Sequence, residues 1–314
     1  MFKELLQMTN ALFFGKKFPL TVTFLLTYRC NYRCPYCLFW KVKKKELTTK
    51  QVFSKIDELK DMGTMNIIYS GGEPLLRKDI GKIIDYTKKR GIFCLLLTNG
   101  ALIPRKLKDI KNVDIIHLSF DGPETITTRD KNSFQDFLKA IKKIKKYKNI
   151  NIWVTTVLTK FNIDHTDLFL ETAKEYKFKI YFQPVSFFEQ YKEFLKPNQT
   201  FINYINSILP SKKNFRKTIK RLIELKKTNP YISNSKEGLK YMLNWPIHQK
   251  KFKCWAEQLH PIIYTNGRTY YCSSKNNVDC NRCWYWCFTE EFVLFSNKIK
   301  LLAQFFLNRN FISV

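Results

Sequence analysis

The run Cys30-Asn31-Tyr32-Arg33-Cys34-Pro35-Tyr36-Cys37 follows directly on an apolar, strand-like stretch near the start of the chain. Three soft thiolate ligands so close together suit an iron–sulfur cluster. A cubane [4Fe–4S] cluster normally takes one protein ligand on each iron, so three protein ligands leave one iron open to an exchangeable ligand. A zinc knuckle or buried free cysteines are the alternatives, although three cysteines with no nearby His make an incomplete tetrahedral zinc site.

Short β-like runs alternate with amphipathic helix-like runs over residues 20–185. Several of the β-like runs are almost continuously apolar, which is typical of strands buried on both faces of a parallel sheet. Right-handed β-α repeats curl toward a barrel, but six strands fall short of the eight that close one. We therefore expect an α/β fold, a partial (β/α)6 TIM-type barrel with an open cleft. The expected strands are Leu20–Leu26, Asn66–Tyr69, Ile92–Thr98, Ile115–Phe120, Asn151–Val157 and Lys179–Phe182.

Four further segments flank this barrel. We expect a helix-like N-terminal segment (1–19), a helical linker (186–253), a small Cys-rich unit (254–291) and an amphipathic C-terminal segment (292–314). The Cys-rich unit has too little apolar mass to hold itself together without metal. Either terminal segment covers an end of the barrel or, alternatively, lies on a membrane surface.

Composition limits the cellular setting and the partners. Nine cysteines, an odd number, without a recognisable signal peptide or membrane span argue against a secreted disulfide framework and favour metal binding in a reducing cytoplasm. The net charge of +29 favours anionic partners such as nucleic acid, phospholipid headgroups or a phosphorylated substrate. Because the excess is carried mostly by lysines scattered over helix-like segments, an ordinary solvated surface explains it equally.

A second motif, Gly71-Gly72-Glu73-Pro74, follows the second expected strand. Together with the Cys-x3-Cys-x2-Cys run and the β-α repeat, it makes residues 20–185 resemble the radical S-adenosylmethionine (SAM) enzymes. The resemblance implies that Cys30, Cys34 and Cys37 hold a [4Fe–4S] cluster that binds SAM. It further implies that one electron from the cluster cleaves SAM to a 5′-deoxyadenosyl radical.

The same resemblance implies a set of SAM contacts at the carboxyl ends of the strands, where barrel active sites lie. The Gly-Gly-Glu-Pro segment meets the amino group of SAM, since glycines permit close approach and carbonyl or carboxylate acceptors suit an ammonium-derived donor. Polar residues at the ends of the third and fourth strands contact the ribose hydroxyls and the methionine carboxylate. An aromatic residue in the cysteine run lies near the adenine, and two residues on the last strands line its pocket. The segment that meets the amino group is Gly71, Gly72, Glu73 and Pro74; the polar residues at the strand ends are Asn99, Ser119 and Asp121; the aromatic residue is Tyr36; and the residues of the adenine pocket are Val154 and Gln183.

A second group of cysteines lies near the C-terminus. Cys254 is followed by twelve residues, Gly267, four residues and Cys272, and then by Cys280-x2-Cys283-x3-Cys287. This spacing resembles the auxiliary-cluster extensions of radical SAM enzymes, of the SPASM and twitch types, and implies one auxiliary [4Fe–4S] cluster with one thiol to spare. It is also similar to the end of the adenosyl hopene transferase type, which acts on a lipid alkene. A structural zinc site is the alternative.

The resemblance implies a radical SAM oxidoreductase or transferase that modifies an unactivated carbon, with a peptide or cofactor precursor favoured as substrate. Its expected partners are a substrate, which is a small molecule, peptide or lipid, and an electron donor such as a flavodoxin or ferredoxin. Its expected location is the cytoplasm. One alternative is an enzyme at the inner membrane face that modifies a lipid. The other is a non-catalytic, metal-bearing nucleic-acid-binding protein, which leaves Gly71–Pro74 without a purpose, so no nucleic acid is expected. His117 is interpreted as a core histidine, with a place inside the barrel as the alternative.

Overall fold

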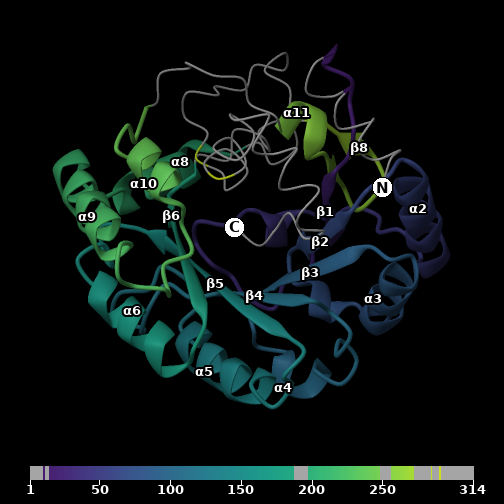
Figure 1. Cartoon of the computed structure of the whole chain (residues 1–314), viewed down its shortest axis with the longest axis horizontal. Helices are drawn as coiled ribbons and strands as arrows, with labels where there is room; N and C mark the ends of the chain where they lie inside the picture. The colour runs from purple at the N-terminus through teal and green to yellow at the C-terminus, as the bar shows by residue number, and fades with distance from the viewer. Residues whose placement is uncertain are drawn as a thin grey trace.

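The computed structural model describes residues 10, 14–186, 197–247, 256–271, 284 and 290. Within them the strands form one sheet of eight, in the order β6-β5-β4-β3-β2-β1-β7-β8. The six strands expected from the sequence are present and pair in parallel with their neighbours. The sheet curves without closing, as expected for a partial barrel (Figure 1). The strands are β1 (Thr21–Thr27), β2 (Asn66–Gly71), β3 (Phe93–Thr98), β4 (Ile115–Ser119), β5 (Asn151–Leu158), β6 (Lys179–Pro184), β7 (Ile262–Ile263) and β8 (Thr269–Tyr270).

Helices cover the outer face of the curved sheet (Figure 1). Their apolar sides pack with alternate strand residues such as Val22, Ile67, Leu96 and Val154 in one large core. The other strand residues point into the barrel, where Ile68, Leu95 and Ile115 form a small apolar cluster. Burial on both faces explains why the strands are almost continuously apolar.

The first repeats are joined by helices whose ends follow local sequence signals. The helix Thr49–Asp61 begins with a capping box, because the Thr48 side chain accepts from Gln51 N–H and Gln51 bonds back to Thr48. The helix that follows β3, Ile103–Lys106, has only one turn. The helices of this part are η1 (Phe39–Lys41), α2 (Thr49–Asp61), η2 (Pro74–Leu76), α3 (Ile80–Lys89), α4 (Ile103–Lys106), α5 (Ser133–Ile144) and α6 (Thr166–Glu175).

After β6 the described chain is helical, with α8 (Gln199–Ile208), α9 (Lys212–Leu225), α10 (Lys236–Met242) and α11 (Ala256–Leu259). It then returns to the sheet, which the sequence did not predict. Strand β7 pairs in parallel with β1, and β8 pairs antiparallel with β7. Gly267, at φ +84°, lies in the turn between β7 and β8, where Gly267 N–H donates to Tyr264 O (2.8 Å). Part of the Cys-rich segment therefore extends the main sheet.

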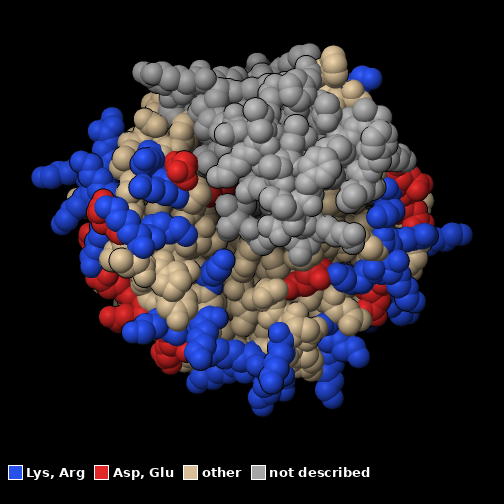
Figure 2. Space-filling view, viewed as in Figure 1, with Lys and Arg blue, Asp and Glu red and all other residues tan. Residues whose placement is uncertain are grey.

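The surface is basic in many places, since Lys and Arg side chains surround the rim formed by the helices (Figure 2). This agrees with lysines scattered over helix faces. None of the helices in the described ranges is both long and apolar enough to cross a membrane. The C-terminal segment 292–314 and all of the N-terminal segment before residue 14 except Asn10 lie outside the described residues.

Candidate active site

The three cysteines of the first motif lie in the loop that leaves the carboxyl end of β1. Cys34 is buried, and Cys30 and Cys37 are half-buried. Burial raises the pKa of all three thiols, that of Cys37 to about 12, and neighbouring thiols add to the effect at Cys30 and Cys37. Without a compensating positive charge the thiolate forms are disfavoured, so the loop is suited to thiolates that bind a cationic metal centre.

Each thiol also receives an N–H donor. Tyr32 N–H donates to Cys30 Sγ (3.4 Å), and the Asn99 amide lies 3.8 Å from the same sulfur. The backbones of Asp130 and Phe39 hydrogen-bond the thiols of Cys34 and Cys37. Hydrogen bonds to ligating sulfurs are one of the means by which proteins tune iron–sulfur clusters. The donor set therefore fits a cluster with three protein ligands.

The described residues contain no group of three His, Cys, Asp or Glu side chains placed to hold a single metal ion. A cubane cluster takes each thiolate on a different iron, which does not require the sulfurs to converge on one point.

Gly71 and Gly72 bring the end of β2 against the chain that leads to the first cysteine. A Cβ at Gly71 would lie 2.2 Å from Thr27 O, and one at Gly72 would lie 2.2 Å from Arg29 O. Gly72 N–H donates to Thr27 O and Glu73 N–H to Arg29 O, both at 2.8 Å. The two glycines are thus required by close backbone approach, whatever ligand binds beside them.

The Glu73 side chain is fully buried and points into the protein. Its Oε1 accepts from Leu75 N–H (3.0 Å) and Thr98 Oγ1 (2.8 Å), and its Oε2 accepts from Asn99 N–H (2.9 Å). Burial raises its pKa to about 7. Three donors of the protein therefore occupy the carboxylate that the sequence analysis assigned to the SAM amino group. Glu73 ties the end of β3, and with it Asn99, to η2, where Pro74 is buried.

Asp121 forms a buried ion pair that the sequence did not predict. Arg129 Nε lies 2.8 Å from Asp121 Oδ2, and Oδ1 of the same carboxylate accepts from Val157 N–H (2.9 Å). Tyr36 Oη donates weakly to Asp121 Oδ2 (3.4 Å), and the Arg129 guanidinium lies over the Tyr36 ring, 5.6 Å from its centre. Burial raises the pKa of Asp121, partly offset by Arg129. Arg129 also favours the thiolate forms of Cys34 and Cys37, so this cation belongs to the cysteine site.

A cavity of about 200 Å³ lies inside the barrel below this pair. Of the predicted SAM contacts, Ser119 and Gln183 line it, together with Arg129. Val154 packs in the core on the helix side of β5 and does not line this cavity. Its neighbours along the strand face the cavity instead, as the alternation of side chains requires. The other lining residues are Thr23, Ile68, Leu95, Leu97, His117, Trp153, Thr155, Val157 and His260.

His117 combines the two interpretations offered for it. It lines the cavity, and its Nε2 is hydrogen-bonded to Thr155 Oγ1 (2.5 Å). Burial lowers the pKa of the imidazole to about 4, so the ring is neutral at physiological pH. Trp153 contacts it edge-on, with ring centres 6.3 Å apart. The cavity is thus mainly apolar, with a few polar groups and the Arg129 guanidinium on its wall.

The second cysteine group, Cys254, Cys272, Cys280, Cys283 and Cys287, lies outside the described residues. Two residues of the same region are placed. Trp284 Nε1 donates to Pro246 O (2.9 Å), and the buried Glu290 carboxylate accepts from Ser235 N–H (3.2 and 3.3 Å) at the start of α10. Burial raises the pKa of Glu290 to about 7.

Residues 24–173 match the family model of the Radical SAM superfamily. The solved structure of SuiB from Streptococcus suis with S-adenosylmethionine is similar at 14% identity and a TM-score of 0.64, over 95% of this chain and 67% of that one. SuiB with precursor peptide SuiA is similar at 15% identity and a TM-score of 0.63, over 90% and 66%. The structure of anSMEcpe with AdoMet and the Cp18Cys peptide is similar at 22% identity and a TM-score of 0.60, over 81% and 74%.

The chain thus spans about two thirds of the length of SuiB. At these identities the structural likeness shows the fold. The matched residues 24–173 include both Cys30–Cys37 and Gly71–Pro74.

Proposed function

We propose that this protein is a radical SAM enzyme in which Cys30, Cys34 and Cys37 hold a [4Fe–4S] cluster at the mouth of the partial barrel. The observation that carries the proposal is the set of three buried or half-buried thiols, each with an N–H donor, beside a buried arginine and a barrel cavity. When bound, the cluster and SAM supply a 5′-deoxyadenosyl radical. The residues of the chain bind and orient the reactants and exclude water.

Different groups around the cysteine loop are suited to different parts of SAM. Arg129 is the cation suited to the methionine carboxylate, since it enters the cavity wall beside Ser119. Because the Glu73 carboxylate is occupied within the protein, backbone carbonyls of Gly71–Pro74 are the acceptors left for the amino group. Asn99, held against Cys30 and Asn31 (2.9 Å), is placed to meet the ribose.

The barrel cavity favours an uncharged group on the substrate. Apart from Arg129, which this proposal assigns to SAM, its apolar walls and neutral His117 would leave a buried charge unpaired, which is costly. An apolar or aromatic side chain of a peptide fits these conditions, as does an apolar part of a cofactor precursor. Structures of the same fold include SuiB with precursor peptide SuiA and anSMEcpe with the Cp18Cys peptide, which supports the peptide version.

The C-terminal cysteines supply the ligands of one auxiliary [4Fe–4S] cluster in this proposal. The β7–β8 hairpin, which lies between Cys254 and Cys272 in the sequence, pairs with β1. It therefore anchors this part of the chain beside the strand that leads to the first cysteine loop.

Anaerobic reconstitution of three cysteine variants tests both clusters. We expect the wild type to hold about eight irons and, once reduced, to release 5′-deoxyadenosine from SAM. Cys34→Ala should abolish that release, whereas Cys283→Ala should spare it and lose about half of the iron. Cys94→Ala is the matched control, because Cys94 is buried in β3 within the main core and should keep both iron and activity.

Two outcomes would contradict the proposal. One is iron-loaded, reduced wild-type protein that leaves SAM intact. The other is Cys34→Ala protein that binds iron and cleaves SAM as the wild type does.

A further inference from the structure

A band of cations surrounds the outer side of the cysteine loop. Residues 28–46 contain six basic residues and one acidic residue, Glu46. An open pocket of about 560 Å³ lies among them and is bordered by Cys30 itself. The pocket residues are Tyr28, Arg29, Cys30, Arg33, Trp40, Val42, Lys43, Lys44, Lys45 and Glu46, which we call the basic pocket.

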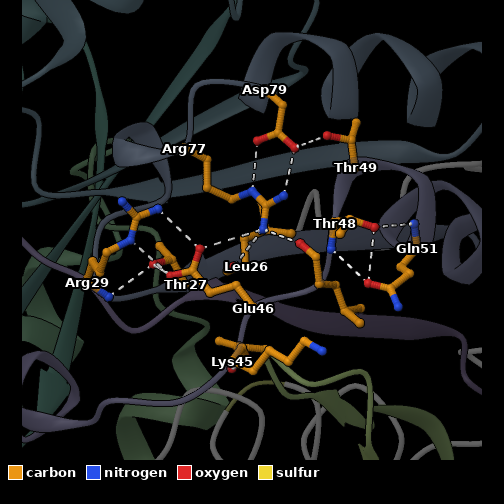
Figure 3. A network of polar contacts seen from close by, with 12 residues as sticks. Leu26, Thr27, Arg29, Lys45, Glu46, Thr48, Thr49, Gln51, Arg77 and Asp79 are labelled. Carbon is orange, nitrogen blue, oxygen red and sulfur yellow. Dashed lines mark hydrogen bonds and ion pairs between the residues drawn. The ribbon is translucent and has the colours of Figure 1, made fainter.

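The single carboxylate of the basic pocket, that of Glu46, is already hydrogen-bonded within the protein. Glu46 accepts from Arg29 Nε (3.0 Å) and Arg29 Nη2 (3.1 Å), and from Thr27 Oγ1 (2.5 Å) (Figure 3). Burial alone would raise the pKa of Glu46, but these hydrogen bonds outweigh it and lower the pKa. Glu46 therefore stays ionised and offsets Arg29, so this carboxylate is not the partner of Lys43 or Lys45.

The backbone that carries these lysines is held in place from two sides. Buried Arg77 donates through Nη1 to Leu26 O (3.2 Å) and Leu47 O (3.0 Å), and its other nitrogens bond Asp79 (2.9 and 2.7 Å) (Figure 3). On the other side Thr265, beside β7, donates its hydroxyl to Lys45 O (3.1 Å). The exposed cations thus project from a fixed frame, which lowers the entropic cost of binding a partner there.

The cysteine loop contributes cations of its own. Arg33 Nη1 donates to Cys30 O (2.5 Å) and Tyr32 O (2.9 Å), and its guanidinium lies 5.1 Å from the centre of the Trp40 ring. The ammonium of Lys41 lies 5.1 Å from the same ring. With cations already over Trp40, its ring is poorly placed to stack on a nucleobase, which a single-stranded nucleic acid site would use.

We infer that the basic pocket is the docking surface for an acidic electron-transfer protein, of the flavodoxin or ferredoxin class, that reduces the metal centre held by Cys30, Cys34 and Cys37. The inference rests on the proposed function, which consumes one electron from outside for each cleavage of SAM. One electron passes from a flavodoxin hydroquinone, which becomes the semiquinone, to that centre. Charge complementarity speeds and orients such an encounter.

Two other anionic partners fit the pocket less well. None of the large apolar side chains that are exposed in the described residues lies in residues 28–46, so insertion into a membrane has no anchor there. A nucleic acid gains no advantage from bordering Cys30. Proximity to the proposed cluster is the feature that favours a redox protein.

The double variant Lys43→Glu/Lys45→Glu tests the surface. Its matched control is Lys142→Glu/Lys143→Glu, which makes the same change in net charge on two exposed lysines of α5. The dissociation constant of an acidic flavodoxin is measured calorimetrically at low salt, and again at higher salt. We expect the double variant to bind about tenfold more weakly, the control to bind like the wild type, and all binding to weaken with salt.

A second measurement separates docking from catalysis. Release of 5′-deoxyadenosine is driven either by reduced flavodoxin or by reduced methyl viologen, a small donor that needs no docking surface. The double variant should lose rate only with flavodoxin. Failure of the wild type with methyl viologen would overturn the proposed function. If the wild type works with methyl viologen, two results would overturn the docking surface alone. One is flavodoxin binding that is unchanged in the double variant. The other is binding of RNA or anionic vesicles that is tighter than that of flavodoxin and is abolished by Lys43→Glu/Lys45→Glu.

Discussion

Gly72→Ala is expected to damage the cysteine site through the backbone, without touching a ligand. The added Cβ would lie 2.2 Å from Arg29 O and 2.5 Å from Tyr28 O, whereas ordinary contacts begin at 3.4 Å. The two chain segments must therefore separate by about 1 Å at this point. Because the obstacle is backbone, no side-chain rotation relieves it.

This separation of the two chain segments affects two backbone hydrogen bonds. The hydrogen bonds from Gly72 N–H to Thr27 O and from Glu73 N–H to Arg29 O, both 2.8 Å, would be lost or strongly weakened. Each contributes about 1 kcal/mol, and overpacking of a filled site costs about 1–3 kcal/mol more. We expect the free energy of unfolding of the metal-free protein to fall by about 4 kcal/mol. Since Arg29 precedes Cys30 directly, iron loading should fall as well.

Urea unfolding of the metal-free protein measures the first effect, and iron content after anaerobic reconstitution measures the second. Gly91→Ala is the matched control. Gly91 has φ +68°, but nothing crowds its Cβ position more closely than Lys60 Nζ at 4.0 Å. It should therefore cost only about 1 kcal/mol of backbone strain and leave iron binding intact. Equal stabilities of the two variants, or full iron loading by Gly72→Ala, would refute the role given to close approach.

Three further predictions follow from buried charges. Asp121→Asn removes the carboxylate paired with Arg129, so the dissociation constant for SAM, measured by equilibrium dialysis, should rise about tenfold, and an unchanged constant would contradict this pairing. Burial raises the pKa of Glu73 and Glu290 from 4.5 in the unfolded chain to about 7, so each contributes stability at low pH that is lost as pH rises toward 8. In urea unfolding, the Glu73→Gln variant should lose about 3 kcal/mol less of its free energy of unfolding over this pH range than the wild type. Parallel pH curves of the two proteins would count against this prediction. His117, whose pKa burial lowers to about 4, should remain neutral at about pH 5.5 in NMR titration, and its contribution to stability should be lost only as pH falls below about 6.5.

The sequence predicted the barrel well, because its strands have a strong local signal. The run Leu20–Leu26 corresponds to β1 at Thr21–Thr27, and Lys179–Phe182 to β6 at Lys179–Pro184. Burial on both faces makes such runs apolar throughout, so they stand out without knowledge of their partners. Strands β7 and β8 have two residues each, which is too short for any period to appear, and only pairing with β1 defines them.

The cysteines and glycines of the candidate site can be recognised in the sequence, whereas the residues that tertiary packing brings to it cannot. Arg129 lies in the loop after β4, eight positions beyond Asp121, and nothing in its neighbourhood indicates a buried cation. The face of β5 on which Val154 lies was likewise not readable from the sequence. Side chains of a strand alternate between faces, so a shift of one residue places a side chain in the opposite layer. Trp153 and Thr155 occupy the cavity side instead.

The two acidic residues that the motifs assigned to SAM, Glu73 and Asp121, support the site from within the protein. Glu73 accepts three hydrogen bonds from the chain, and Asp121 pairs with Arg129 while accepting from the β5 backbone. A buried carboxylate is tolerated only with such partners, and all of these partners except Leu75 belong to segments that carry a cysteine donor or a cavity residue. Glu73 fixes Asn99 beside Cys30, and Asp121 fixes Arg129 beside Cys34. The acidic residues of the motifs therefore position neighbouring groups. In the proposed function the direct contacts to SAM would then come from backbone atoms of Gly71–Pro74 and from Arg129, which lies outside the motifs.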